Sequence, residues 1–386
     1  MKYDFDTVVD RGGTAAVKWD IRSPEEAKNG YLPLSVADME FRSPPCVVKA
    51  LEEAAKRGIY GYTHPDRAFF DACRWWFKNR HGFDCEDSAI VPVCGVVPGL
   101  NYSVRAYTDP GDGVMIMTPV YPPFMGVVRD CGRRMADVPL INDCGEYSID
   151  FAALEQAAKQ PENKLLLLCS PHNPVGRIWT ADELARIVRI CRDNGVTLVS
   201  DEIHYDLLID GGHTAILTLE PDAVLLTAPS KTFNVPGLEL ALAVIPNEEL
   251  RKKFADTVGS IGGNGFPYFA RYAAIAAFSP EGADWLDAVM GYIGENFRQF
   301  KEYLDRELPE LKVTPIQGTY LAWVDFRALG LSSGELEKLL SEKCLISAIP
   351  GTAFGKVGEG FMRFNIALPR SEMMKALERL KKGIRG

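Results

Sequence analysis

Short, almost wholly apolar runs recur along the middle of the chain and limit its fold more than any other feature. A strand with one face in water alternates apolar and polar residues, whereas a strand covered on both faces does not. Helical patterns separate several of these non-alternating runs, which is typical of an α/β fold with a mostly parallel central sheet flanked by helices. The runs are Ala89–Val93, Val114–Met117, Lys164–Cys169, Val196–Ser200, Ala223–Thr227 and Leu240–Ile245.

One helix between two of these runs can be placed closely. Thr180 and Glu183 have the spacing of a capping box, apolar residues follow at helical spacing over Leu184–Cys191, and Gly195 supplies the end. A second capping box at Ser23–Glu26 predicts a short helix near the start of the chain.

The last hundred residues have a different pattern of apolar and polar residues, which predicts a smaller α+β domain. A long amphipathic helical pattern starts at about Asp284, and strand-like runs follow at Leu311–Thr314, Thr319–Asp325 and Gly360–Ile366. We therefore expect residues 1–45 to join the small domain, residues 46–285 to form the large cofactor-binding α/β domain, and residues 286–386 to form the small C-terminal domain.

Composition narrows the class of partner. The 386 residues include 43 Lys and Arg against 52 Asp and Glu, a net charge of −9, so we expect a small-molecule ligand and neither nucleic acid nor a membrane. The nine cysteines form no C-x-x-C pair, which disfavours a metal site. With no secretory leader pattern at the start, these features predict a cytoplasmic protein.

Polar residues follow four of the apolar runs, where ligands bind in open parallel sheets. Taken singly, each has an ordinary explanation. In chain order, these are a strand-to-helix turn, a proline turn, a capped helix with a buried histidine, and a surface lysine. Together they suit a cofactor with a phosphate, a ring nitrogen, a phenolate oxygen and an aldehyde, which describes pyridoxal 5′-phosphate (PLP). The four segments are Gly95–Gly99, Ser170–Gly176, Asp201–His204 and Ala228–Phe233.

At this point the sequence resembles the fold-type I, PLP-dependent aminotransferase class I/II family over essentially its whole length. Asn173-Pro174 with Gly176, Asp201-Glu202-Ile203 and Ser230-Lys231 occur in the family's order and at its usual separations. The resemblance implies a PLP-dependent transferase fold and cis peptide bonds at Thr118-Pro119 and Asn173-Pro174.

Catalytic and ring-binding roles follow from the resemblance, residue by residue. It implies that Lys231 is the catalytic residue that binds the cofactor aldehyde, that Asp201 pairs with the ring nitrogen and that Asn173 bonds the ring oxygen. Tyr121 would stack on the ring, and Arg363 would bind the substrate carboxylate. The chemistry agrees, because a carboxylate keeps the ring nitrogen protonated and an arginine fork matches a carboxylate.

Phosphate-binding roles are implied in the same way. The Val96 and Val97 amides and the Ser230 hydroxyl would hold the phosphate, with Tyr62 reaching the phosphate of a neighbouring subunit. The resemblance therefore implies a homodimer. His204 occupies the place of a cofactor-contacting tyrosine of aminotransferases and is expected to contact the cofactor.

Four further stretches are similar to the cystathionine β-lyase-like, or carbon–sulfur lyase, branch of the family. Some positions depart from the usual patterns: Glu239 replaces an arginine, Ala228 replaces a phosphate-binding serine, and Ser35 stands where the branch usually has tryptophan. The loss of the arginine removes a phosphate counter-charge, and Ser35 leaves the substrate open. The four stretches are Arg11–Asp20, Leu32–Phe41, Ser230–Leu238 and Gly318–Asp325.

The function that these features predict is α,β-elimination of an S-substituted L-cysteine to pyruvate, ammonia and a thiol. Two alternatives stay open: an aminotransferase of the same fold, and a PLP-fold protein used for regulation or binding. The residues do not specify which thiol leaves, and they do not separate elimination from transamination.

Overall fold

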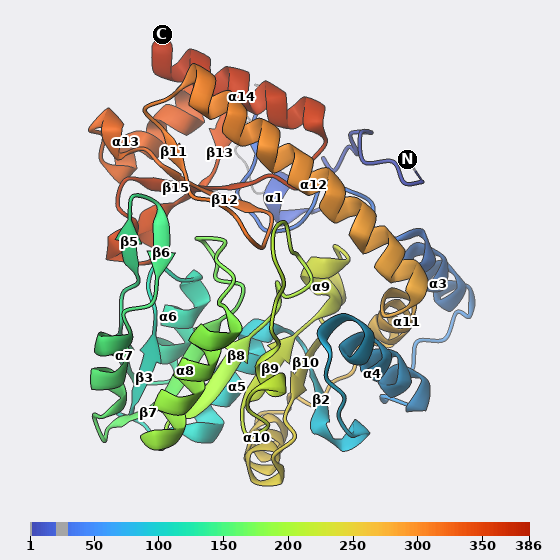
Figure 1. Ribbon diagram of the computed structural model, residues 1–386. Helices are drawn as coiled ribbons and strands as arrows, with labels where there is room; N and C mark the ends of the chain where they lie inside the picture. The colour runs from blue at the N-terminus through green and yellow to red at the C-terminus, as the bar shows by residue number, and fades with distance from the viewer. Residues whose placement is uncertain (1, 21–29) are drawn as a thin grey trace.

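A seven-stranded sheet forms the centre of the larger part of the molecule, as the computed structural model of residues 2–20 and 30–386 describes it (Figure 1). β10 is antiparallel to both of its neighbours, and the remaining neighbours that pair directly are parallel, so the predicted mostly parallel sheet is confirmed. The strands, in spatial order, are β2 (Ile90–Val93), β10 (Ala241–Val244), β9 (Val224–Thr227), β8 (Thr197–Asp201), β7 (Asn163–Cys169), β3 (Gly113–Ile116) and β4 (Arg134–Asp137).

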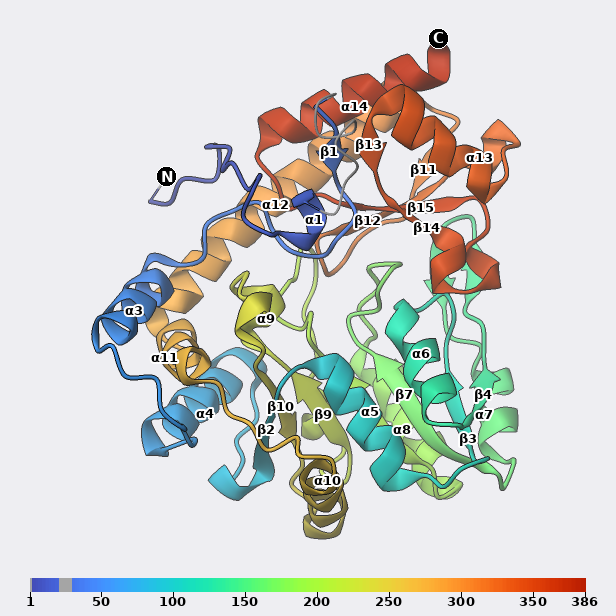
Figure 2. The same ribbon diagram turned by 180° about the vertical axis from the view of Figure 1, so that it is seen from behind.

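Helices cover both faces of this sheet, which explains why its strands do not alternate. Along β7, Leu165 and Leu167 pack into one apolar core, while Leu166 and Leu168 pack into another on the opposite face. Figures 1 and 2 show the two faces with their helices. Those on the first face are α5 (Val96–Tyr107), α6 (Pro122–Asp130) and α10 (Glu248–Ser260), and those on the second include α4 (Arg67–His81), α7 (Phe151–Ala158) and α8 (Ala181–Asp193).

The capping box predicted for α8 is present. The Thr180 hydroxyl accepts from the Glu183 amide, and the Glu183 carboxylate accepts from the Thr180 amide. The capping box predicted at Ser23–Glu26 lies outside the described residues.

A four-stranded antiparallel sheet in the order β11-β12-β15-β14 forms the centre of the smaller part, with long helices packed over it (Figure 1). β1 (Leu32–Pro33) pairs in parallel with β13. The elements are α12 (Pro280–Glu307), β11 (Lys312–Val313), β12 (Leu321–Asp325), α13 (Ser333–Lys338), β13 (Ile346–Ser347), β14 (Ile349–Pro350), β15 (Phe361–Asn365) and α14 (Arg370–Arg385).

α12 begins before Asp284 and runs through the predicted boundary at 285, so the division into domains at 45 and 285 stays a prediction. The peptide bonds Thr118-Pro119 and Asn173-Pro174 are cis as predicted, and Ser170-Pro171 is cis as well. No helix within residues 2–20 and 30–386 is both long enough and apolar enough to cross a membrane. The remaining elements are α1 (Val17–Asp20), β1 (Leu32–Pro33), α3 (Pro45–Lys56), β5 (Ile141–Asp143), β6 (Glu146–Ser148), α9 (Pro229–Thr232) and α11 (Tyr268–Ala277).

Candidate active site

A cavity of about 190 Å³ lies at the carboxyl ends of the parallel strands, where ligands bind in open α/β sheets. It brings together residues as far apart in the chain as Ala37 and Pro236, and many of them meet here because β2, β7, β8 and β9 all end at this edge. Most of the predicted site residues line it: Val96, Val97, Tyr121, Asn173, Asp201, His204, Ser230 and Lys231.

Lys231 enters the cavity from α9, the short helix that follows β9. Its Nζ donates to the carbonyl oxygen of Ala37 at 2.6 Å. Burial lowers the pKa of Lys231 to about 8, because the charged amine loses its solvation. A substantial fraction of the amine is then neutral near physiological pH, as a nucleophile or a general base requires.

Asp201 is the last residue of β8 and is buried. Its Oδ1 accepts from the Ile203 amide at 3.1 Å. Burial raises the pKa of Asp201 to about 7, since the carboxylate has lost most of its hydration. A cation placed against this carboxylate would be strongly stabilised and would return it to the ionised form.

Arg363 reaches the site from β15 in the smaller part of the molecule. Its Nη1 donates to Asn173 Oδ1 at 3.1 Å, and its Nη2 donates to the carbonyl oxygen of Ser35 at 3.0 Å. The Nε is buried and has no hydrogen-bond partner among the described residues. Burial lowers the pKa of Arg363 to about 10, so a bound anion would favour this guanidinium in its charged form.

The N-terminus of α5 faces the same cavity through Val96 and Val97. Amides in the first turn of a helix have no partner within the helix, and the helix dipole is positive at this end. The two residues therefore offer backbone donors to an anion such as a phosphate.

Tyr121 and His204 add two rings to the cavity wall. Burial raises the pKa of the Tyr121 phenol, so the ring is neutral. Burial also lowers the pKa of His204 to about 3, and its ring meets Tyr320 edge-on at 6.1 Å between centroids. His204 is therefore a neutral aromatic wall at physiological pH, not a cation.

Two predicted residues differ in how they are placed. Tyr62 is fully exposed and does not line the cavity of its own chain. Ser230 does line it, although its hydroxyl donates to the Leu240 carbonyl oxygen at 3.4 Å. Of the departures noted in the sequence, Ala228 is buried, and Glu239 is exposed and has a left-handed backbone.

Two groups that contact Lys231 or the segment around Ala37 were not identified from the sequence. The carbonyl oxygen of Ala37 accepts from Lys231 and also from the Tyr320 hydroxyl at 3.0 Å. Asn234 fixes the same segment by accepting from the Met39 amide at 2.9 Å. Both groups lie in stretches that resemble the carbon–sulfur lyase branch, Ala37 in Leu32–Phe41 and Asn234 in Ser230–Leu238.

A larger cavity of about 640 Å³ adjoins the first and shares Ala37, Lys231 and Pro236 with it. Asp38 and Glu40 on its wall each pair with two cations: Arg11 lies 2.6 Å from Asp38 and 3.0 Å from Glu40, and Lys18 lies 3.4 Å from Asp38 and 2.7 Å from Glu40. This cavity provides room for a substrate beside Lys231.

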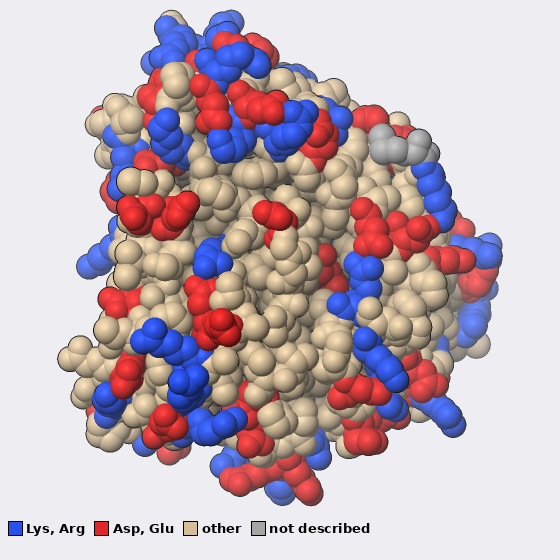
Figure 3. All heavy atoms as spheres, in the orientation of Figure 1, with Lys and Arg blue, Asp and Glu red and all other residues tan. Residues whose placement is uncertain are grey.

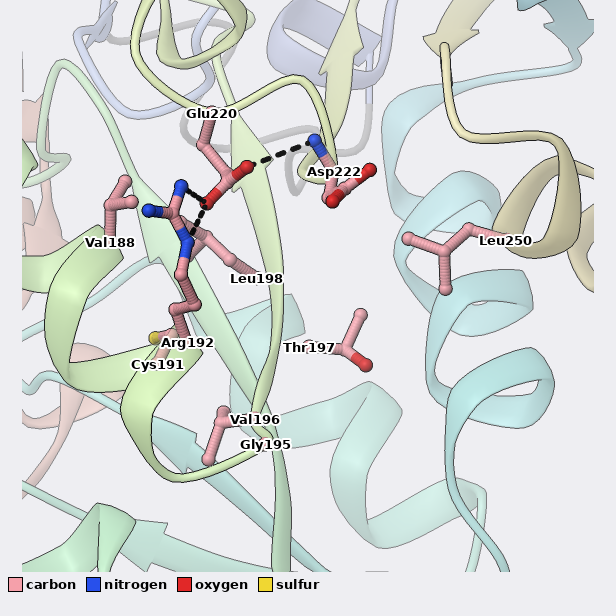
Figure 4. Close-up of a pocket in the computed structure, with 10 residues that line it drawn as sticks. All are labelled: Val188, Cys191, Arg192, Gly195, Val196, Thr197, Leu198, Glu220, Asp222 and Leu250. Carbon is pink, nitrogen blue, oxygen red and sulfur yellow. Dashed lines mark hydrogen bonds and ion pairs between the residues drawn. The ribbon is translucent and has the colours of Figure 1, made fainter.

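Another cavity, drawn in Figure 4, lies at the amino end of β8, away from Asp201. Three charged groups line it, and two of them, Arg192 and Glu220, form an ion pair at 2.5 Å. Burial raises the pKa of the Cys191 thiol to about 12, which leaves it unreactive.

The surface in Figure 3 has Lys and Arg interspersed with Asp and Glu, without one large basic patch on that face.

The residues of the first cavity fit PLP by their chemistry. Lys231 offers an amine for the aldehyde, Asp201 offers a buried carboxylate for a protonated ring nitrogen, and α5 offers free amides for the phosphate. The unpartnered Nε of Arg363 offers a donor for a substrate carboxylate. Within the described residues there is no cluster of His, Cys, Asp and Glu that could hold a metal ion.

Comparison with known proteins agrees with the fit of this cavity to PLP. The sequence model of the family "aminotransferase class I and II" matches residues 29–380. Cystathionine β-lyase PatB of Bacillus subtilis is 40% identical over 98% of this chain and 99% of its own length, and protein MalY of Escherichia coli is 33% identical over 99% of each chain. The crystal structure of cystalysin from Treponema denticola, which contains PLP, superimposes with a TM-score of 0.96 at 38% identity and covers 100% of this chain and 99% of its own.

Proposed function

This chain belongs to the aminotransferase class I and II family, and from that premise we propose that it is a PLP-dependent carbon–sulfur β-lyase. The substrate class is S-substituted L-cysteines, and the products are pyruvate, ammonia and the free thiol. The observation that carries the proposal is a half-buried lysine, with its pKa lowered to about 8, that shares one cavity with a buried carboxylate and lies close enough to a buried arginine to be influenced by its charge.

Residues of one cavity would hold the cofactor. Lys231 attaches it, Asp201 pairs with the ring nitrogen, Asn173 bonds the ring oxygen and Tyr121 covers the ring. The Val96 and Val97 amides, with Ser230, hold the phosphate, and His204 forms a neutral wall. When bound there, PLP supplies an electron sink for the electrons released at the substrate Cα.

The protein's own groups then direct the chemistry. Arg363 binds the substrate carboxylate with its unpartnered Nε and orients the Cα–H bond toward Lys231. Lys231, whose pKa is about 8, accepts the Cα proton as general base. The Cβ–S electron pair leaves with the thiolate, which takes a proton, and water hydrolyses the remaining three-carbon fragment, which still carries the substrate nitrogen, to pyruvate and ammonia.

An aminotransferase of the same fold is the second candidate, because the family is defined by that activity and removal of the Cα proton is common to both reactions. The curated relatives at 33–40% identity that carry an activity name are cystathionine β-lyases, which favours elimination. A regulatory or binding protein is less well supported, since the cavity contains residues suited to the aldehyde and the ring nitrogen of the cofactor, Lys231 and Asp201.

We also propose that the enzyme is a homodimer and acts in the cytoplasm. Tyr62 is exposed together with Ile59 and Tyr60, and this apolar surface suits a second copy whose phosphate site Tyr62 would complete. All nine cysteines are free, in keeping with a reducing compartment.

Product analysis tests the proposed reaction. L-cystathionine, S-methyl-L-cysteine and L-cysteine are incubated separately with the holoenzyme, and pyruvate, ammonia and thiol are measured. Equal amounts of the three products support the lyase. An aminotransferase would instead convert the cofactor to its pyridoxamine form with an amino donor and restore it with a keto acid, and this cycle would be faster than the release of pyruvate.

A further inference from the structure

We propose that Asp206 is a positioning residue for Lys231 that acts from behind the cavity through Thr232. Asp206 is buried and does not line the cavity. The proposal rests on the proposed function, since it assumes that Lys231 is the lysine that binds the cofactor and removes the Cα proton.

The helix that carries Lys231 cannot hold its own position. α9 has four residues, Pro229–Thr232, which is about one helical turn and too short to be stable alone. Thr232 follows Lys231 directly, is completely buried, and donates from its hydroxyl to Asp206 Oδ2 at 2.7 Å. This charge-assisted hydrogen bond ties the helix to the segment after β8.

Two side chains of α4 hold the Asp206 carboxylate in the orientation that receives Thr232. The Trp76 ring nitrogen donates to Asp206 Oδ1 at 3.1 Å, and His81 Nε2 lies 2.7 Å from the same oxygen. The side chains of His81 and Asp206 are 4% and 1% exposed, so water does not compete for these bonds. The Trp76 ring nitrogen also lies 3.3 Å from Asp206 Oδ2. Both α4 side chains thus fix Oδ1, and Oδ2 accepts its shorter bond from Thr232.

His81 is held in turn by a stacking contact with Tyr205, with ring centroids 3.6 Å apart and planes inclined by 6°. Tyr205 follows His204, which lines the cavity. The contacts among Asp206, His81 and Tyr205 therefore join the two segments that carry Asp201 and Lys231, through residues that do not line the cavity. A buried carboxylate with several matched donors is rigid, whereas the loss of a donor leaves it free to turn.

Fixing α9 matters because the charges around Lys231 influence its pKa. Asp38 and Asp201 raise that pKa, Arg363 lowers it, and each effect depends on the position of Nζ. A displacement of the helix would alter these distances and the approach of Nζ to the substrate Cα. A measurement of folding stability alone would not detect either change.

Thr232→Val tests the proposal, since it removes the hydroxyl and keeps the shape of the side chain. The visible absorbance of the bound cofactor is titrated against pH in the holoenzyme, and kcat and KM are measured separately. We expect the titration midpoint to shift by about 0.5 pH unit or more. We also expect kcat to fall roughly 10-fold, with KM changed by less than about twofold.

Two further variants serve as controls. Thr232→Ser keeps the donor and should restore both the midpoint and kcat. Thr108→Val removes another buried hydroxyl, which donates to the Val104 carbonyl at the far end of α5, and should leave both unchanged.

Three outcomes are decisive. A Thr232→Val enzyme with the wild-type midpoint and kcat overturns the inference, and so does one whose thermal stability alone is reduced. Retention of the lysine-linked absorbance band in Lys231→Ala would contradict the proposed function itself. The two failures are therefore distinguishable.

Discussion

Replacement of Arg363 by alanine should weaken the use of every α-amino acid substrate. The guanidinium is buried, and it donates to Asn173 and Ser35 while its Nε stays unpartnered, so it can hold a carboxylate with charge-assisted bonds that water does not screen. Two such bonds at about 1.5–3 kcal/mol each amount to roughly 3–6 kcal/mol. At about 1.4 kcal/mol per factor of ten, kcat/KM should fall about 10²–10⁴-fold.

The assay measures pyruvate release from S-substituted L-cysteines, with L-alanine and ethylamine as competing ligands. Arg363→Ala should raise the inhibition constant of L-alanine and leave that of ethylamine, which has no carboxylate, nearly unchanged. Arg363→Lys keeps the charge and loses the fork, so its kcat/KM should fall between wild type and alanine. Wild-type kcat/KM in the alanine variant, or equal effects on both inhibitors, would refute the carboxylate assignment.

Three other predictions concern the cofactor site. Borohydride reduction of the holoenzyme followed by peptide mapping should place the pyridoxyl group on Lys231, and a label on another lysine would exclude that role. Tyr62→Phe should lower PLP affinity in a dimer seen by light scattering, and an active monomer with full cofactor occupancy would exclude the cross-subunit role. In the cofactor-free protein the pKa of Asp201 is raised to about 7, so the folded state holds a proton that the unfolded state has released. The free energy of unfolding of the wild type should therefore fall by up to roughly 4 kcal/mol relative to Asp201→Asn as pH rises from 4 to 7. Urea unfolding across that pH range measures this difference, and parallel curves would show that Asp201 is not desolvated.

The sheet could be predicted because the apolar runs reflect burial on both faces, which is a local signal. β4 was missed because Arg134–Asp137 lies at the sheet edge and is largely exposed, so its sequence lacks the apolar signature. The antiparallel direction of β10 was not predictable either, since Ala241–Val244 is as apolar as its parallel neighbours.

Within the site, the residues at strand ends were predictable because parallel strands end at one edge. The contact of Arg363 with Asn173 joins residues 190 positions apart, and the bond between His81 and Asp206 joins residues 125 positions apart. Such contacts are set by how the smaller part and α4 pack on the sheet, and no local pattern encodes them. The role of Ala37 is still less visible, because it acts through its backbone carbonyl.

The central claim is that Lys231 removes a Cα proton and that the thiolate is then expelled. The most direct measurement is the number of pyruvate molecules formed per subunit from an S-substituted L-cysteine when no keto acid is present. The wild-type enzyme should form many equivalents of pyruvate and thiol in equal amounts, and Lys231→Ala should form almost none. A single turnover that ends with the pyridoxamine form of the cofactor, or undiminished turnover in Lys231→Ala, would contradict this account.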